Sequence, residues 1–225
     1  MSTITSDAPG QTPGRAPRRA PVRNFLNRYL RPAIVMTLLL TILTGLIYPG
    51  IVTGLAQLIF PSQANGSLIT VNGKVIGSDL IGQYWTSLKY FHGRPSATVN
   101  LAGTPSPYQA NNSSASNLGP TSKVLVQDVQ QRVAAWHAEF KQEGLPVPSG
   151  SVPVDLVTAS GSGLEPDITI AGALYQVPIV AKARGLSQSV VQQLVMNHVH
   201  GRFLFIFGEP YVNVLELNMA LDALK

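Results

Sequence analysis

The chemistry that this sequence could do begins with a histidine and an arginine on either side of a glycine, in the stretch Phe91-His92-Gly93-Arg94-Pro95. An imidazole next to a guanidinium could hold an anion such as a phosphate or a carboxylate. The alternative is a packed loop, in which the arginine binds backbone carbonyl oxygens. Both interpretations remain open, so His92 and Arg94 are candidate contacts for an anion or a partner.

A second candidate is the run of small residues Ser160, Gly161, Ser162 and Gly163. We predict a short strand before it (Val154–Thr158) and a helix after it (Ile168–Gln176), and such a turn can present backbone N–H groups to phosphate. As a nucleotide signature the run is weak, because it lacks the lysine of a Walker A loop and the third glycine of the dinucleotide fingerprint. Asp167 is expected to cap the following helix or to lie in its first turn.

Other catalytic and metal-binding patterns are missing from the sequence. It contains no G-x-S-x-G elbow, P-loop, H-E-x-x-H or D-K-T-G-T motif. With zero cysteines, disulfides, thiol catalysis and cysteine-ligated metals are excluded. His198 and His200 are two residues apart and cannot share a helical face, so they do not indicate a metal pair. We therefore expect no catalytic residue and no metal site, and a subunit or binding module is favoured over an enzyme.

The element that must position any of these sites is an apolar run, Ala33–Phe60, which contains no charged residue. As a helix, its first twenty residues would rise about 30 Å, the thickness of a bilayer's hydrocarbon core. We predict one transmembrane helix with its outer end over residues 31–60, in contact with membrane lipid. Gly45 offers a small surface to a neighbouring helix, and Pro49 is expected to kink the helix near its outer end.

The charge on either side of this run predicts its orientation. Residues 1–31 carry six arginines against Asp7 alone, whereas residues 32–225 carry ten basic and ten acidic residues. By the positive-inside rule, residues 1–30 form a cytoplasmic tail, expected to be disordered because it is rich in proline, and residues 61–225 form an extracytoplasmic domain. A nucleic-acid-binding tail is disfavoured because the span follows directly. A signal peptide cleaved near Gly54-Leu55-Ala56 is the rival, but the run is longer than a signal peptide's apolar region.

The external part reads as a mixed α+β domain. Asn72-Gly73 between two β-type runs predicts a hairpin, because both turn residues need positive φ. Residues 83–120 read as a loop, and apolar residues at helical spacing predict a helix from Thr121 or Ser122 to about Gln142. We also predict a short second turn from Pro178 to Arg184, and two more helices that begin after the N-caps Ser187 and Asn213.

Nine stretches, in this order along the chain, carry a resemblance to a known family: Leu30–Ala33, Thr44–Pro49, Gln63–Ile69, Ile81–Gln83, Tyr90–Ala97, Ser116–Leu118, Val152–Ser160, Pro178–Arg184 and Val212–Asn218. Together they resemble KdpC, the C subunit of the bacterial Kdp potassium-transporting ATPase. The resemblance covers about residue 30 to residue 225 and leaves out the proline-rich tail.

The resemblance implies a non-catalytic accessory subunit of an ATP-driven potassium importer in the bacterial inner membrane. Its partners would be a channel-like subunit that carries K⁺ and a P-type subunit that hydrolyses ATP. The family's role is assembly, and a chaperone effect that raises the ATP affinity of the P-type subunit. It also suggests ATP as a ligand of the stretch Val157–Ile168, although the arginine bias places this stretch outside the membrane, where ATP is scarce. The alternative is a membrane-anchored periplasmic domain that binds or hydrolyses a ligand on its own.

Overall fold

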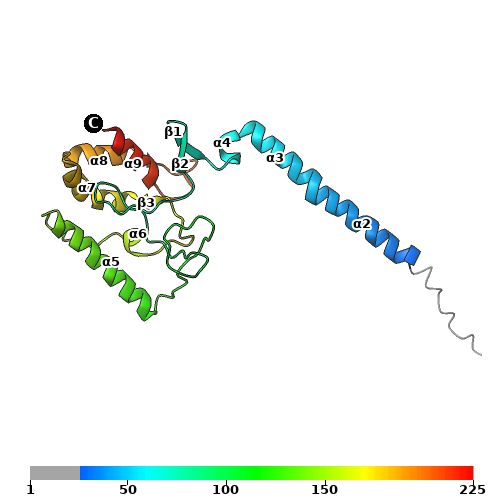
Figure 1. The fold of residues 1–225 in the computed structure, drawn as a ribbon, viewed down its shortest axis with the longest axis horizontal. Coiled ribbons are helices and arrows are strands. Elements are labelled where there is room, and N and C mark those ends of the chain that lie inside the picture. The colour runs from blue at the N-terminus through cyan, green and yellow to red at the C-terminus, as the bar shows by residue number, and fades with distance from the viewer. Residues whose placement is uncertain (1–25, 225) are drawn as a thin grey trace, which may run out of the picture. The chain divides into compact units, whose positions relative to one another are not determined.

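The computed structural model describes residues 26–224, which divide into two compact units that meet in sequence between Pro61 and Ser62 (Figure 1). Most of the predicted tail, with Arg15, Arg18, Arg19 and Arg23, lies outside the described residues. The helix begins at Leu26, inside the stretch predicted as tail, and so five residues before the predicted start of the span.

In the described part of the first unit, residues 26–59 form one long run of helix. It consists of the π-helical turn η1 (Leu26–Leu30), α2 (Arg31–Ile42), a second π-helical turn η2 (Leu43–Ile47) and α3 (Tyr48–Ile59). The stretch Asn27–Ile59 is long and apolar enough to cross a membrane, and neither α2 nor α3 contains a buried residue. A helix that is apolar on all sides is suited to contact lipid or other helices.

The π-helical turn η2 lies directly before Pro49, the residue at which a kink is predicted. Proline has no N–H, so the carbonyl of Gly45, four residues earlier, loses its usual donor. Directly before Pro49, the N–H of Tyr48 donates to Leu43 O, five residues back, and the helix continues beyond the proline. A π-helical turn of this kind is a recognised cause of helix bending.

The short helix α4 (Pro61–Ala64) spans the boundary between the units, and the predicted hairpin follows it in the second unit. Strands β1 (Leu68–Val71) and β2 (Lys74–Ser78) pair antiparallel, with an irregularity in register between Ile69 and Thr70. The turn residues Asn72 and Gly73 have φ values of 51° and 77°. These values lie in the left-handed region that a two-residue hairpin turn requires, which confirms the hairpin prediction.

The rest of the unit is a small sheet with helices packed on it. Strands β3 (Asp167–Thr169) and β4 (Val199–His200) both pair antiparallel with the middle strand β5 (Tyr211–Asn213). The helices are α5 (Lys123–Gln142), α6 (Val154–Val157), α7 (Ile170–Arg184), α8 (Gln188–Asn197) and α9 (Val214–Ala223). In Figure 1, α7, α8 and α9 are grouped together, whereas α5 (green) lies on the other side of α6.

Helix α7 connects the two parts of the core. Its residues Val177 and Val180 pack with the sheet, α8 and α9 around Phe91 and Leu217. Ile179, on another face of the same helix, packs with α5 and α6 in a second cluster that includes Trp136, Phe140 and Leu156. A helix that buries residues on several faces is central to its domain.

Local signals located three helices accurately. Ser122, Ser187 and Asn213 each accept hydrogen bonds from N–H groups of the helix that follows, as predicted for N-caps. On α9, Val214, Leu217 and Leu221 are buried and Leu224 is partly buried. On α8, Val191 and Val195 are buried.

Three predictions around residues 154–184 are wrong. Val154–Val157 is helix α6, not a strand, and its buried Asp155 carboxylate accepts a hydrogen bond of 2.7 Å from Thr169 N. Asp167 lies in β3 and does not cap α7; Thr169 does, through a bond from Gly172 N. The run Ser160–Gly163 therefore leads from helix α6 into strand β3, and not from a strand into a helix as predicted.

Pro178 does not end the helix that contains it, because α7 runs unbroken to Arg184. A proline inside a helix costs about 3 kcal/mol. Burial of Val177, Ile179 and Val180 on either side offsets this cost, since each such side chain contributes about 1.5–3 kcal/mol.

The loop between β4 and β5 has an apolar tip, Phe203–Phe207. All five side chains are exposed, Phe205 by 95%, and the N–H groups of Phe203 and Phe207 donate to each other's carbonyls. Leu204 and Phe205 have φ values of 51° and 64°, a conformation that is unfavourable for residues with a side chain. The tip thus combines exposed apolar surface with local strain.

Candidate functional site

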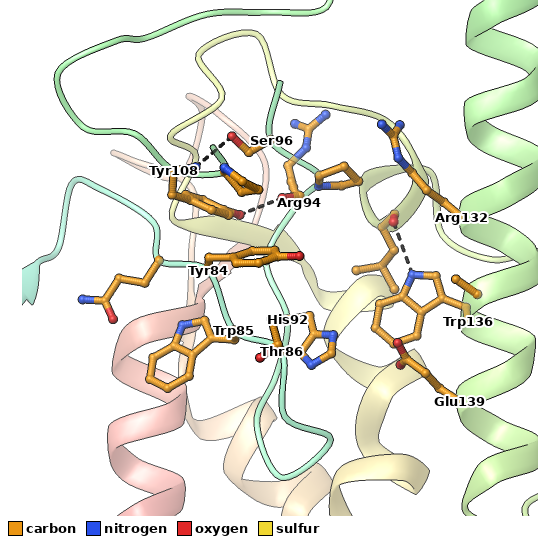
Figure 2. A pocket seen from close by; sticks show the side chains of 16 residues that line it. Tyr84, Trp85, Thr86, His92, Arg94, Ser96, Tyr108, Arg132, Trp136 and Glu139 are labelled. Atoms are coloured by element: carbon orange, nitrogen blue, oxygen red, sulfur yellow. Dashed lines mark hydrogen bonds between the residues drawn. The ribbon is translucent and has the colours of Figure 1, made fainter. Parts of the chain in front are cut away.

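The second unit contains a cavity of about 420 Å³ between the loop that follows the hairpin and one face of α5 (Figure 2). The loop contributes Tyr84, Trp85, His92 and Arg94, together with Tyr108 further along. Helix α5 contributes Arg132, Trp136 and Glu139. The lining therefore combines aromatic rings with two guanidinium groups and one carboxyl group.

The loop has no helix or strand at Phe91 and His92, so its backbone groups there need other partners. Two side-chain amides from neighbouring helices supply them. Asn218 of α9 accepts from Phe91 N at 2.8 Å and donates to Phe91 O at 3.0 Å. Gln176 of α7 makes the same pair of bonds with the next residue, accepting from His92 N at 2.7 Å and donating to His92 O at 3.1 Å. Both amides are buried, so four backbone groups are paired where water cannot reach them.

Tyr108 supports the wall next to these clamps. Its hydroxyl donates to Arg94 O at 2.7 Å, and its ring leaves no room for a side chain at Gly93. Burial raises the pKa of Tyr108, against an opposing effect of the Arg94 charge, so the phenol stays protonated and continues to donate.

The α5 face is positioned by bonds to the end of α6. Trp136 Nε1 donates to Leu156 O at 3.3 Å, and Arg132 Nη1 donates to Val157 O at 2.9 Å. The same guanidinium forms a loose ion pair with Asp128, at 3.8 Å. Burial raises the pKa of Glu139 from 4.5 to about 7, so near neutral pH this carboxyl is protonated about half the time.

The two residues singled out in the sequence, His92 and Arg94, both line the cavity. Burial lowers the pKa of His92, and the Nε2–H of its neutral ring can donate to Ser87 O at 3.2 Å. Arg94 has no ion pair or side-chain hydrogen bond among residues 26–224, and its Nε atom is buried. His92 is thus held as an uncharged wall residue. Arg94 has no ion pair among the described residues, but it also lines a smaller pocket with Asp155, Glu165 and Asp167.

The loop Ser160–Gly163 does not line this cavity but packs against the segment that follows Arg94. Ser160 N donates to Pro95 O at 3.2 Å, and Gly163 N donates to Ser160 Oγ at 2.8 Å. The carbonyl of Gly163 accepts from Ser96 Oγ at 2.7 Å. Two of the four amides in this loop are therefore already paired inside the protein.

The candidate packing residues of the span lie on an uncovered helix. A side chain at Gly45 would meet no atom within 4 Å. Pro49 lies in the first turn of α3. Among residues 26–224, no group of three or more His, Asp or Glu side chains is arranged to hold a metal ion.

Our sequence reasoning missed Arg132, Glu139, Trp85, Tyr84 and Tyr108 as lining residues. A signal was present for two of them, because Arg132 and Glu139 are four residues before and three residues after Trp136 on a helix that the sequence predicts. Such spacings share one helical face. The loop residues carried no comparable signal.

One long apolar helix followed by a mixed α+β domain with a polar-rimmed cavity defines a class of protein: a domain held at a membrane by a single helix. A model of the family described as "K+-transporting ATPase, c chain" (KdpC) matches residues 30–223. The chain is 55% identical over 189 residues, 81% of its length, to the potassium-transporting ATPase KdpC subunit of Rhodopseudomonas palustris (strain BisB18), covering 92% of that protein.

Two further relatives of the same name give similar values. Identity is 54% over 186 residues with the protein of Bradyrhizobium diazoefficiens, covering 80% of this chain and 89% of the relative. It is 52% over 188 residues with that of Methylobacterium nodulans, covering 81% and 90%. The chain belongs to the KdpC family.

Proposed function

We propose that this chain is the non-catalytic accessory subunit of a potassium-transporting ATPase complex. The observation that carries the proposal is the extent of the family match, which runs from residue 30 to residue 223 and so includes both the apolar helix and the domain. The relatives named above are subunits of such an ATPase. The sequence lacks the D-K-T-G-T motif at which a P-type ATPase is phosphorylated, which supports the assignment of hydrolysis to another subunit.

The helix Asn27–Ile59 anchors the chain in the inner membrane, with the N-terminus in the cytoplasm and the domain outside. The arginines before the span support this orientation. Fusions of alkaline phosphatase and of a fluorescent protein that matures only in the cytoplasm, each made to Lys225, test it. Phosphatase activity without fluorescence is expected, and the reverse would overturn the orientation.

Within the complex, the chain binds the channel-like subunit and the P-type subunit, aids their assembly and raises the ATP affinity of the P-type subunit. The loop Ser160–Gly163 acts in this scheme as a structural turn. The bond from Ser160 N to Pro95 O supports that role, because it occupies an N–H group that a phosphate ligand would need. The bond from Ser96 Oγ to Gly163 O also ties the loop to the rest of the domain.

Reconstitution of the ATPase with and without this chain tests the proposal. Omission should raise the KM for ATP while kcat per assembled complex changes less, because the chain contributes binding and no reacting group. An unchanged KM would contradict the chaperone effect. ATP binding by this chain alone, abolished by a substitution at Gly163 that leaves the fold intact, would instead favour a nucleotide site in the loop.

A further inference from the structure

Unpaired buried polar atoms gather around the cavity described above. Six buried side-chain nitrogen or oxygen atoms of residues 26–224 have no hydrogen-bond partner. Three of them belong to residues that line the cavity: Trp85 Nε1, Arg94 Nε and Glu139 Oε2. Buried polar atoms without partners are rare and costly. Three residues that line the cavity therefore each carry one buried polar atom that the described part of the chain leaves unpaired.

The charge around the cavity indicates what kind of ligand it is. Among residues 26–224, Arg94 has no acidic residue within ion-pair distance, and Arg132 has only the loose contact with Asp128. Figure 2 shows both side chains on the cavity wall. A guanidinium presents a planar set of donors that matches the oxygens of a carboxylate or phosphate.

Glu139 is the group that opposes an anion in this cavity. Its raised pKa of about 7 means that it is readily protonated, and a protonated carboxyl can donate a hydrogen bond to an anion. The other titratable or charged lining groups are His92, which burial keeps neutral, the two arginines and the phenols of Tyr84 and Tyr108. Among the groups that line the cavity, two guanidiniums are positive and Glu139 alone can be negative, while Asp128 and Glu165 lie near its edge.

We propose that this cavity binds a small organic oxyanion, with a phosphate or carboxylate group on Arg94 and Arg132 and an apolar body against Trp136. A volume of about 420 Å³ is within the range for small-molecule sites, and aromatic side chains supply the apolar wall. The site is separate from the loop Ser160–Gly163, and the proposal does not depend on the role of the chain in an ATPase.

The chain carries its own reporters, because its two tryptophans, Trp85 and Trp136, both line the cavity. The full chain in nanodiscs of zwitterionic lipid is titrated at pH 8 with phenyl phosphate, and separately with uncharged benzyl alcohol. Tryptophan emission and calorimetry follow binding. Saturable binding of phenyl phosphate with a change in emission is expected, with little or none for benzyl alcohol.

Three variants test which groups hold the anion. Arg94→Gln should weaken phenyl phosphate binding about ten- to hundredfold, the range for a hydrogen bond to a charged group. Arg202→Gln is the matched control, because Arg202 is an exposed arginine that pairs with Glu209 in the loop between β4 and β5, away from the lining of the cavity. This variant should bind phenyl phosphate as the native chain does. Glu139→Gln should bind more tightly than the native chain at pH 8, because it removes a negative charge beside the ligand.

The opposite signs of these effects separate binding from misfolding. A cavity that had merely collapsed could not bind more tightly after one substitution and more weakly after another. Equal responses to phenyl phosphate and benzyl alcohol, or equal affinities of the Arg94→Gln and Arg202→Gln variants, would overturn the proposal. No saturable binding of phenyl phosphate by the folded native chain would overturn it as well.

Discussion

Replacement of Gly163 by alanine should destabilise the domain strongly. Gly163 is buried with a φ of 69°, in the left-handed region. A Cβ atom there would lie 2.5 Å from Thr98 Cγ2 and 2.6 Å from Ser114 O, closer than real Cβ contacts allow. The backbone oxygen cannot rotate away, so two loops must separate.

The magnitude follows from three contributions. The left-handed conformation costs a residue with a side chain roughly 1–2 kcal/mol. Overpacking of a buried site adds about 1–3 kcal/mol. Loss of the 2.9 Å bond from Ser114 N to Ser162 O adds about 1 kcal/mol. Together these give about 3–6 kcal/mol, equivalent to a fall in Tm of roughly 6–24 °C for a domain of this size.

Thermal unfolding of the full chain, followed by tryptophan emission, measures the effect, because both tryptophans lie in the second unit. Gly161→Ala is the matched control: it lies in the same loop, but its Cβ would meet no atom within 4 Å and its φ is not positive. That variant should melt within about 2 °C of the native chain, as surface substitutions usually do. Equal Tm values for the two variants would refute the argument from strain and close packing.

Four other substitutions test separate features. Asn218→Asp keeps the shape of the amide but cannot donate to Phe91 O, and should cost about 2–4 kcal/mol in denaturant unfolding, since it also buries a charge; native-like stability would mean that the clamp contributes little. The folded-state pKa of Glu139 is raised from 4.5 to about 7, so the native chain loses stability as pH rises through this range. The Tm of Glu139→Gln minus the Tm of the native chain should therefore increase from pH 5 to pH 8. A Tm difference that does not change with pH would contradict the raised pKa. Gly45→Ile should leave membrane insertion intact and reduce co-purification of partner subunits, with Gly54→Ile, about half a helical turn round, as the control; equal yields would mean that Gly45 faces lipid. Phe205→Gly should raise stability by about 1 kcal/mol by removing left-handed strain, and an unchanged or lower Tm would mean that the tip is stabilised by contacts of Phe205.

The features that sequence reasoning located correctly are those with a local cause. The span follows from an absence of charge over one stretch, the hairpin from the backbone demands of Asn72-Gly73, and the starts of α5, α8 and α9 from capping side chains. Each signal lies within a few residues of the structure that it specifies.

The errors occur where distant contacts decide the structure. The stretch Val154–Val157 has residue types that favour a strand, but it forms a helical turn that places the Asp155 carboxylate on Thr169 N. Pro178 was expected to end a helix, yet burial of its neighbours sustains α7. Of the residues that line the cavity, the sequence singled out only His92 and Arg94 on the loop. The opposite wall comes from α5, and no periodic pattern in the sequence connects this helix with the loop.

The amide clamps on Phe91 and His92 also set the order in which the domain can mature. Gln176 lies 84 residues after the backbone that it holds, and Asn218 lies 127 residues after it. Contacts between residues this far apart form slowly, because a long loop must close before the bonds contribute any stability. While the chain is being synthesised, the cavity wall therefore has no fixed position until the last helix has emerged. A chain that ends before Asn218 could still contain the span, the hairpin and α5. It would lack the side chain that holds Phe91, so this clamp forms only after the last helix is complete.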